Sequence, residues 1–303
     1  MFRFAALYGL SRMLGRRPYY EQSNGCAHES VDEIGQIFPE WGRRIRFIEG
    51  NSSGKLSMVS WGGYCCNDAD VRFNDPEPLR KYADSKFLQV SGDHLQSYRY
   101  FLPYNSEILR ILSFSPAIEA TMEQHRQRIF GMDTHTHKLC VHTRTGDFSI
   151  NHWITSLPFT EAATNFAASY LRSAGLVNTE LALVLLGEDK AFLKNVTYDA
   201  SLFSVLYSMP AMSRGEDMCF CARHCNSLLI TAPSSTFAWW IGYFMSQSYN
   251  TPDGKGKIFY NSDFKTYAPY THDNYPSEWI PLRLQQKKRK GKKNEGSGVV
   301  KIE

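Results

Sequence analysis

A cation and a carboxylate follow a short apolar run near the middle of the chain. The run Leu139–Val141 predicts a buried strand, and His142, Arg144 and Asp147 come directly after it. In open α/β sheets, ligands bind outside the carboxyl ends of the strands. The planar fork of an arginine matches a phosphate group in a way that a lysine does not. Arg144 is therefore a candidate ligand for the diphosphate of a nucleotide-sugar, and a structural salt bridge with Asp147 or Asp217 is the alternative.

Two other predicted strands also end in polar residues. Leu181–Leu186 is followed by a Gly-Glu-Asp turn, and Ser227–Thr231 leads into the Ser235-Thr236 pair, where a helix begins. Helix N-termini offer free N–H groups to phosphates, although these hydroxyls also suit simple helix capping. Asp217, on a helix predicted between the strands, could accept hydrogen bonds from a base or ribose, or lie on the surface. We expect the three strand ends to border one crevice.

Two patterns raise the question of a metal site. Four potential ligands lie within seven residues: Cys219, Cys221, His224 and Cys225. The segment is predicted to be helical, which spreads these side chains around the helix, and no second cysteine pair with zinc spacing is evident. The Asp68-Ala-Asp70 pair fits a solvated loop as well as a metal beside a nucleotide-sugar. The sequence therefore predicts no metal.

Strands and helices alternate in the second half of the chain. This order predicts an α/β fold whose parallel sheet is covered on both faces. Residues 22–105 are less regular, with two strand-like pieces, Arg46–Ile48 and Leu56–Ser60. The expected strands are 139–143, 181–186, 202–206 and 227–231, and the expected helices are 2–15, 106–112 capped by Ser106, 116–130, 160–173 capped by Thr160, 214–225 and 234–245.

Length and charge set the domain organisation. The 303 residues suffice for two domains, and we expect a region at 1–135, a nucleotide-binding region at 136–285 and a disordered basic tail at 286–303. The net charge is +4, but residues 285–303 hold seven basic and two acidic residues. The rest of the chain is thus nearly neutral, so we expect it to bind no nucleic acid.

Cysteines and targeting signals are weakly informative. Seven cysteines are too few for a disulfide scaffold of this length, and Cys140, in an apolar strand, is expected to be ordinary core. Asn51 and Asn195 open glycosylation triplets, which permit a luminal location. No apolar run is long enough to predict a transmembrane helix. The arginine-rich start could pass for a targeting peptide, but the helical spacing of its apolar residues favours a first helix of the fold.

Several motifs resemble a known family. Val141–Phe148 is similar to the first motif of the α1,2-fucosyltransferases, Leu183–Asp189 to the second, and Met1–Leu10 to the family's first helix. The most specific likeness is the spacing from Asp217 through Cys-Asn to Ser-Thr-Phe-Ala-Trp-Trp-Ile-Gly-Tyr243. The chain is identified as a divergent, N-terminally short member.

The resemblance implies an inverting enzyme with a GT-B-like, two-lobed fold and no metal. Residues 1–135 would form the acceptor-side lobe and residues 136–285 the GDP-fucose-binding lobe. The enzyme would move L-fucose from GDP-fucose to the 2-hydroxyl of a galactose on a glycan, in the Golgi lumen, attached to the membrane through an anchor upstream. Arg144 would contact the β-phosphate, and Asp147 would orient it or serve as a base. The donor residues carried over are His142, Arg144, Asp217, Ser235 and Thr236.

Two departures from the family pattern leave an alternative open. Thr145 stands where the family has a second arginine, and the chain starts inside the first-helix motif, without the Gly-Asn pair that precedes it. A catalytically impaired relative that binds nucleotide-sugar or glycan without turnover is therefore the second hypothesis. A nucleic-acid-associated protein, suggested by the basic tail, is the third. The acceptor glycan is not readable from the residues.

Overall fold

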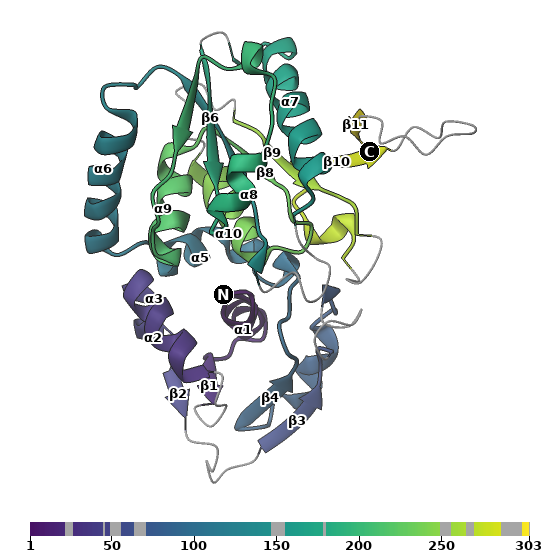
Figure 1. Ribbon diagram of the computed structural model, residues 1–303. Helices are drawn as coiled ribbons and strands as arrows, with labels where there is room; N and C mark the ends of the chain where they lie inside the picture. Colours follow the sequence, from purple (N-terminus) through teal and green to yellow (C-terminus); the bar gives the residue numbers. More distant parts are fainter. Residues whose placement is uncertain are drawn as a thin grey trace. The chain divides into compact units, whose positions relative to one another are not determined.

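The structure is a computed structural model that forms two compact units. They are Met1–Pro116 with Ala268–Tyr275, and Ala117–Tyr267 with Pro276–Glu303 (Figure 1). The described residues are 1–21, 27–44, 46–48, 56–63, 71–146, 155–177, 180–248, 256–264, 270–285 and 299–302. The division between the units falls after Pro116, whereas the sequence suggested a domain limit at 135.

The first unit contains short helices and two small parallel sheets, in which β1 pairs with β2 and β3 with β4. Its helices and strands are α1 (Phe2–Met13), β1 (Tyr19–Glu21), α2 (Ala27–Ile37), α3 (Pro39–Arg44), β2 (Arg46–Ile48), β3 (Leu56–Ser60), β4 (Phe87–Ser91) and α5 (Asn105–Ile111), with 3-10 helices at Glu77–Tyr82, Tyr98–Tyr100, Leu102–Tyr104 and His272–Asn274.

Helix α1 lies at the centre of this unit. Most of its side chains are buried, and Phe4 packs against Tyr20 and Trp41 with ring centroids 4.9 and 4.7 Å apart. Its basic residues bind within the same unit: Arg3 donates to Tyr20 Oη at 3.0 Å, and Arg12 bonds Glu107 Oε1 at 3.0 Å. The predicted first helix is therefore confirmed, and its arginines have structural partners.

The second unit is built on one sheet of seven strands in the order β11-β10-β9-β8-β5-β6-β7. All neighbouring pairs are parallel except β10 and β11. Its elements are α6 (Pro116–Phe130), β5 (His137–His142), α7 (Leu157–Ser173), β6 (Leu181–Leu186), α8 (Lys190–Asn195), a 3-10 helix at Ala200–Leu202, β7 (Val205–Ser208), α9 (Arg214–His224), β8 (Ser227–Ile230), α10 (Thr236–Ser248), β9 (Ile258–Asn261), β10 (Ile280–Gln285) and β11 (Val299–Ile302).

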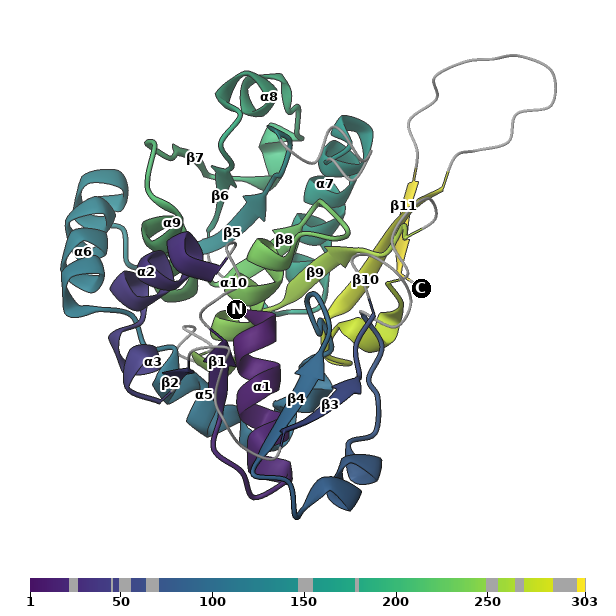
Figure 2. The ribbon, with the colours of Figure 1, turned by 90° about the horizontal axis from the view of Figure 1, so that it is seen from below.

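Alternate residues of the central strands face opposite sides of the sheet. Leu139 and Val141 pack in one core with Leu183 and with the buried face of α7, which includes Ala163 and Ala167. Cys140 instead bonds Cys225, which directly follows α9, and α9 and α10 lie on the opposite face of the sheet from α7 (Figures 1 and 2). The predicted α/β arrangement, with helices on both faces, is confirmed because every residue of β5 and β6 is buried.

Some local predictions differ from the structure in detail. Tyr104, not Ser106, is the N-cap of α5, and Ser156, not Thr160, is the N-cap of α7. The Thr160 hydroxyl instead donates to Ser156 O at 2.8 Å, inside the first turn. The third strand begins at Val205, after a 3-10 helix. Residues 286–298 of the predicted tail lie outside the described residues, whereas 299–302 form β11.

Cys140 is not an ordinary core cysteine. It forms a disulfide with Cys225, across 85 positions of sequence. The prediction was wrong because a strand residue pairs according to the order of strands in the sheet, which spacing along the chain does not reveal. Cys219 and Cys221 remain buried free cysteines. The described part of the chain holds no cluster of three or more His, Cys, Asp or Glu residues that could bind a metal.

Candidate functional site

The site predicted at the strand ends lies where the strand order reverses. Counted along the chain, the six parallel strands follow the Rossmann order 3-2-1-4-5-6, in which β5 is the first strand and β8 the fourth. Ligands of such sheets bind at the carboxyl edge between these two strands. Arg144 follows β5 and Ser235 follows β8, so the structure brings together the predicted strand ends of β5, β6 and β8.

A pair of threonines joins the segments that follow β5 and β8. The Arg144 N–H donates to Thr155 Oγ1 at 2.7 Å, and Thr155 N–H donates to Arg144 O at 2.8 Å. Thr155 Oγ1 is also 2.9 Å from Thr231 Oγ1, whose hydroxyl donates to His142 O at 2.7 Å. Both threonines are buried. This chain of hydrogen bonds fixes the backbone of Arg144 against the end of β8.

Two glycines let the segments after β5 and β6 approach closely. Gly146 has φ +51°, and a Cβ there would lie 2.6 Å from Glu188 Oε1. Gly187 has φ +152°, and a Cβ there would lie 2.2 Å from Thr143 Oγ1. Neither conformation suits a residue with a side chain. The Thr143 hydroxyl and N–H both donate to Leu186 O at 2.9 Å, so this approach is hydrogen-bonded as well.

Arg144 is half-buried beside the carboxylate of Glu188. Its Nη1 is 3.8 Å from Glu188 Oε1, and 26% of its side chain is exposed compared with 55% of the Glu188 side chain. The expected alternative partners were Asp147 and Asp217. Asp147 lies outside the described residues. Thr145, at the position of the family's second arginine, donates to Asp189 Oδ2 at 3.3 Å, and Asp189 caps α8 through the Phe192 N–H.

His142 is a buried polar group of the site, with 6% of its surface exposed. Burial, aided by the neighbouring Arg144 charge, lowers the pKa of His142 to about 4, so the imidazole is neutral at pH 7. Its ring lies 5.4 Å from that of Phe237 at the start of α10. Nδ1 is buried and has no hydrogen-bond partner among the described residues. A buried, unsatisfied ring nitrogen is a costly arrangement unless a ligand completes it.

The N-terminus of α10 supplies the other wall of the site. Ser235 Oγ accepts from the Ala238 N–H at 3.3 Å, so Ser235 does perform the capping role that was its alternative. Thr236 is the first residue of α10 and is half-buried. Ser234 Oγ is buried and, in the part of the chain described, bonds to nothing. The free N–H groups of this first turn and the Ser234 hydroxyl can donate to a phosphate.

Asp217 lies in the first turn of α9 and is half-buried. Burial is the main cause that raises the pKa of Asp217 to about 7; the charge of Lys190 opposes the rise, and Glu216 and Glu188 add to it. Glu188 also pairs with Arg144, so Asp217 belongs to the same electrostatic neighbourhood. A half-buried carboxyl with a raised pKa at a strand-end crevice is a candidate ligand group.

The remaining predicted residues fall elsewhere. Asn51, Asp68 and Asp70 lie outside the described residues. Asn195 is exposed at the end of α8. The residues missed by sequence reasoning are Thr155 and Thr231, for which nothing local in the sequence is a signal. Among the described residues, no helix is both long and apolar enough to cross a membrane.

A parallel sheet in Rossmann order, with an arginine and a helix N-terminus at its switch point, is the architecture of nucleotide-binding α/β proteins. No family model matches the chain. The chain is 30% identical over 302 residues to a putative galactoside 2-alpha-L-fucosyltransferase of Caenorhabditis elegans, svh-11, covering 94% of this chain and 75% of the relative. It is 26% identical over 298 residues to a galactoside 2-alpha-L-fucosyltransferase of the same species, covering 94% and 76%.

A solved structure supports the fold. A point mutant of Arabidopsis thaliana FUT1, in complex with GDP, aligns with 99% of this chain and 70% of its own, with a TM-score of 0.50 and 10% identity. The predicted GT-B-like α/β fold is thereby confirmed. The chain belongs to the galactoside 2-alpha-L-fucosyltransferase family and is a transferase.

Proposed function

We propose that the chain transfers L-fucose from GDP-fucose to the 2-hydroxyl of a galactose residue on a glycan, with inversion. The observation that carries this proposal is the family relationship over 94% of the chain. The switch-point geometry supports it, because an arginine, a helix N-terminus and a buried histidine surround the place where a nucleotide diphosphate binds in this fold.

Within this proposal, the donor site lies at the carboxyl edge of β5 and β8. Arg144 and the first turn of α10, with Ser235 and Thr236, hold the phosphates. His142 Nδ1 and Asp217 bind polar groups of the nucleoside. Fucose departs through an oxocarbenium-like transition state in which negative charge builds on GDP. Donors fixed in advance around that charge are the largest electrostatic contribution available to the reaction.

No metal is needed in this scheme, because Arg144 and the α10 N–H groups neutralise the leaving phosphate. Asp147 keeps its proposed role as an orienting carboxylate or a base for the acceptor hydroxyl. We further propose a luminal Golgi location, with Asn195 as an accessible glycosylation site and Asn51 as a second candidate. A shift in mass on enzymatic deglycosylation that is smaller by one glycan in an Asn195→Gln variant tests the first of these sites.

The decisive assay uses GDP-fucose with a β-galactoside acceptor, in the presence and absence of EDTA. We expect fucosylated product with a 1,2 linkage and an inverted anomeric centre, seen by NMR, and a rate that EDTA leaves unchanged. A GDP-fucose Kd measured in parallel separates the alternatives. Tight donor binding without transfer to any galactoside would establish the impaired relative and refute the enzyme.

A donor panel sharpens the assay. GDP-mannose shares the whole nucleotide and differs in the sugar. We therefore expect it to bind through the same groups, and we expect no transfer of its mannose to the acceptor. Equal transfer from both donors would contradict the proposed substrate. Deleting residues 286–303 removes the edge strand β11 together with the basic segment. It should leave GDP-fucose binding intact, since the proposed donor groups lie on the central strands and their helices.

A further inference from the structure

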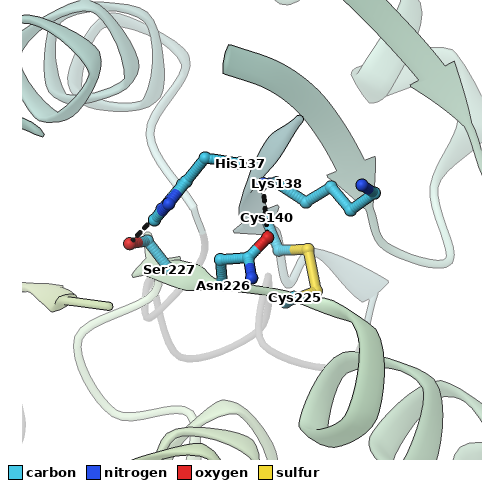
Figure 3. The surroundings of a disulfide bond; sticks show 6 residues. All are labelled: His137, Lys138, Cys140, Cys225, Asn226 and Ser227. Atoms are coloured by element: carbon cyan, nitrogen blue, oxygen red, sulfur yellow. Dashed lines mark hydrogen bonds between the residues drawn. A yellow bond between two sulfur atoms is a disulfide. The ribbon is translucent and has the colours of Figure 1, made fainter. Parts of the chain in front are cut away.

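A disulfide joins strand β5 to Cys225, in the short connection between α9 and β8 (Figure 3). Cys140 lies within β5, two residues before His142, and Cys225 directly follows α9. Both sulfur-bearing residues are fully enclosed, with 0% and 1% exposure. The bond therefore links the elements that carry His142 and Asp217, the two residues proposed to bind the nucleoside.

The next two residues, Asn226 and Ser227, are also hydrogen-bonded to β5 (Figure 3). Asn226 Oδ1 accepts from the Lys138 N–H at 2.7 Å, and the Asn226 N–H donates to Lys138 O at 3.0 Å. Ser227 Oγ is 2.8 Å from His137 Nε2. Residues 225–227 thus make one covalent bond and three hydrogen bonds to β5.

These links matter because β8 has only four residues. Its register, from Leu139 opposite Ser227 to His142 opposite Ile230, decides where Thr231 falls. A slip of one residue would turn every side chain of the strand to the other face of the sheet. Thr231 must reach His142 O and Thr155, and through them it fixes the backbone of Arg144. Bonds that fix the amino end of β8 therefore also fix the position of Thr231 at its carboxyl end.

We propose that the Cys140–Cys225 disulfide is a positioning device for the donor site, and that this unit must fold in an oxidising compartment. The ligand in this proposal rests on the proposed function; the bond and its effect on the backbone do not. It holds α9 and β8 in register with β5, so that His142, Arg144 and the start of α10 keep their places.

The bond forms when the two thiols lose two protons and two electrons. The electrons pass to the disulfide of a thiol–disulfide oxidoreductase, which becomes a dithiol. Stable structural disulfides form where such oxidants act, in the secretory lumen or outside the cell. Because both cysteines are enclosed in the folded unit, the exchange occurs before the sheet closes, and soluble thiols do not reach the bond afterwards. The bond is thus a permanent link.

Helix α9 offers a matched control. Cys219 and Cys221 are also fully buried, and neither is bonded to another cysteine. Replacing both with alanine removes two buried thiols from the same helix and leaves the link to β5 intact. Comparison of the two pairs separates the loss of the link from the loss of packing.

The test uses Cys140→Ala, Cys225→Ala, their double variant and the Cys219→Ala/Cys221→Ala control. Either single change breaks the same bond, so we expect all three to lower Tm alike, by about 5–15 °C, and not additively. At 10 °C, where the variants are folded, we expect the Kd for GDP to rise about tenfold. The control keeps the wild-type Kd.

Hydrogen exchange supplies a readout without ligand. The amides of Thr143 and Thr231 bond to Leu186 O and His142 O, and we expect both to exchange faster in the disulfide variants but not in the control. Should the alanine pair fail to fold, Cys140→Val with Cys225→Ala refills the lost space.

Two results would overturn the proposal. One is peptide mapping that finds Cys140 and Cys225 as free thiols in active protein. The other is a folded double variant whose Thr143 and Thr231 amides exchange hydrogen at the wild-type rate. That result would show that the disulfide has only a local effect. A wild-type protein with the bond intact that fails to bind GDP would instead contradict the proposed function.

Discussion

Strand β5 carries a buried histidine at each end, and the two have opposite surroundings. His137, at the amino end, is bonded to Ser227 Oγ at 2.8 Å. His142, at the carboxyl end, has Nδ1 buried with no hydrogen-bond partner among the described residues. Most buried polar groups with a purely structural role are satisfied within the fold. The contrast separates a structural end of the strand from the end that we propose to bind the donor, called the binding end below.

Charged groups repeat the contrast. At the amino end, the buried Lys138 Nζ bonds Thr136 O at 2.9 Å and lies 3.4 Å from Asp133 Oδ2, which also accepts from the Tyr207 hydroxyl. Although burial opposes it, hydrogen bonds from Thr136 and Tyr207 and the Lys138 charge hold the pKa of Asp133 well below its ordinary value. At the carboxyl end, Asp217 has a raised pKa instead.

The largest expected effect is at the binding end. Arg144→Ala should lower kcat/KM for fucose transfer about 100-fold, near 3 kcal/mol, because a fixed donor to the leaving phosphate is lost. Thermal stability should change little, since the arginine is partly exposed. Arg144→Lys should recover only part of the rate. Arg223→Ala, which removes an exposed pair with Glu119, is the control. Unchanged turnover in Arg144→Ala would refute the assigned role.

At the structural end, the opposite pattern is expected. Asp133→Ala leaves the buried Lys138 without its carboxylate partner, and we expect a loss of about 2 kcal/mol in the free energy of unfolding. The GDP Kd, measured on the folded protein at low temperature, should stay at the wild-type value. A lowered pKa also predicts that the contribution of Asp133 is present above its unfolded pKa and disappears as the pH falls through the folded value. A marked rise in the GDP Kd of Asp133→Ala would show that the amino end of β5 also affects donor binding, which would contradict the comparison.

Replacing the Asp217 carboxylate should raise thermal stability and weaken GDP binding. Its folded pKa of about 7 lies above the ordinary 3.8, so the ionised carboxylate destabilises the fold above pH 7. The penalty shrinks as the pH falls from 7 toward 4 and vanishes below the unfolded pKa. Asp217→Asn should therefore raise Tm at pH 8, have no such effect near pH 4, and weaken GDP binding. A lower Tm at pH 8 would show that the carboxylate is structurally satisfied.

The smallest effect concerns Thr145. Thr145→Arg adds the cation found in the family motif, at the cost of one weak bond to Asp189. We expect the Kd for GDP to fall about threefold, equivalent to a partly exposed charge pair of about 0.6 kcal/mol. Calorimetric titration with GDP measures it, and Thr145→Gln, which adds length without charge, is the control. Equal tightening by both variants would rule out an effect of charge.

The sequence predicted the second unit better than the first. Leu181–Leu186 and Leu139–Val141 are apolar runs whose burial on both faces is a local property, and the polar residues that end them mark the site. Of the short strands before Pro116, β2 and β3 match the predicted pieces Arg46–Ile48 and Leu56–Ser60. The strands β1 and β4 and the 3-10 helices were not predicted, because this unit depends on contacts such as Phe4 with Trp41, which join distant parts of the chain.

The same limit explains what was missed within the site. The Cys140–Cys225 bond requires β8 to lie beside β5, and that strand order becomes visible only in the fold. Thr155 and Thr231 meet for the same reason. His142 and Arg144 could be proposed from the sequence because they lie at the end of β5 and two residues after it, where a local motif carries the information.

The most direct test of the comparison is hydrogen exchange with and without GDP. The proposed donor site predicts that GDP slows exchange at residues 143–146 and 234–238, and leaves residues 137–138 and 226–227 unchanged. Protection confined to other segments, or no protection at 143–146 under saturating GDP, would contradict the assignment of the donor site to the carboxyl edge of β5 and β8.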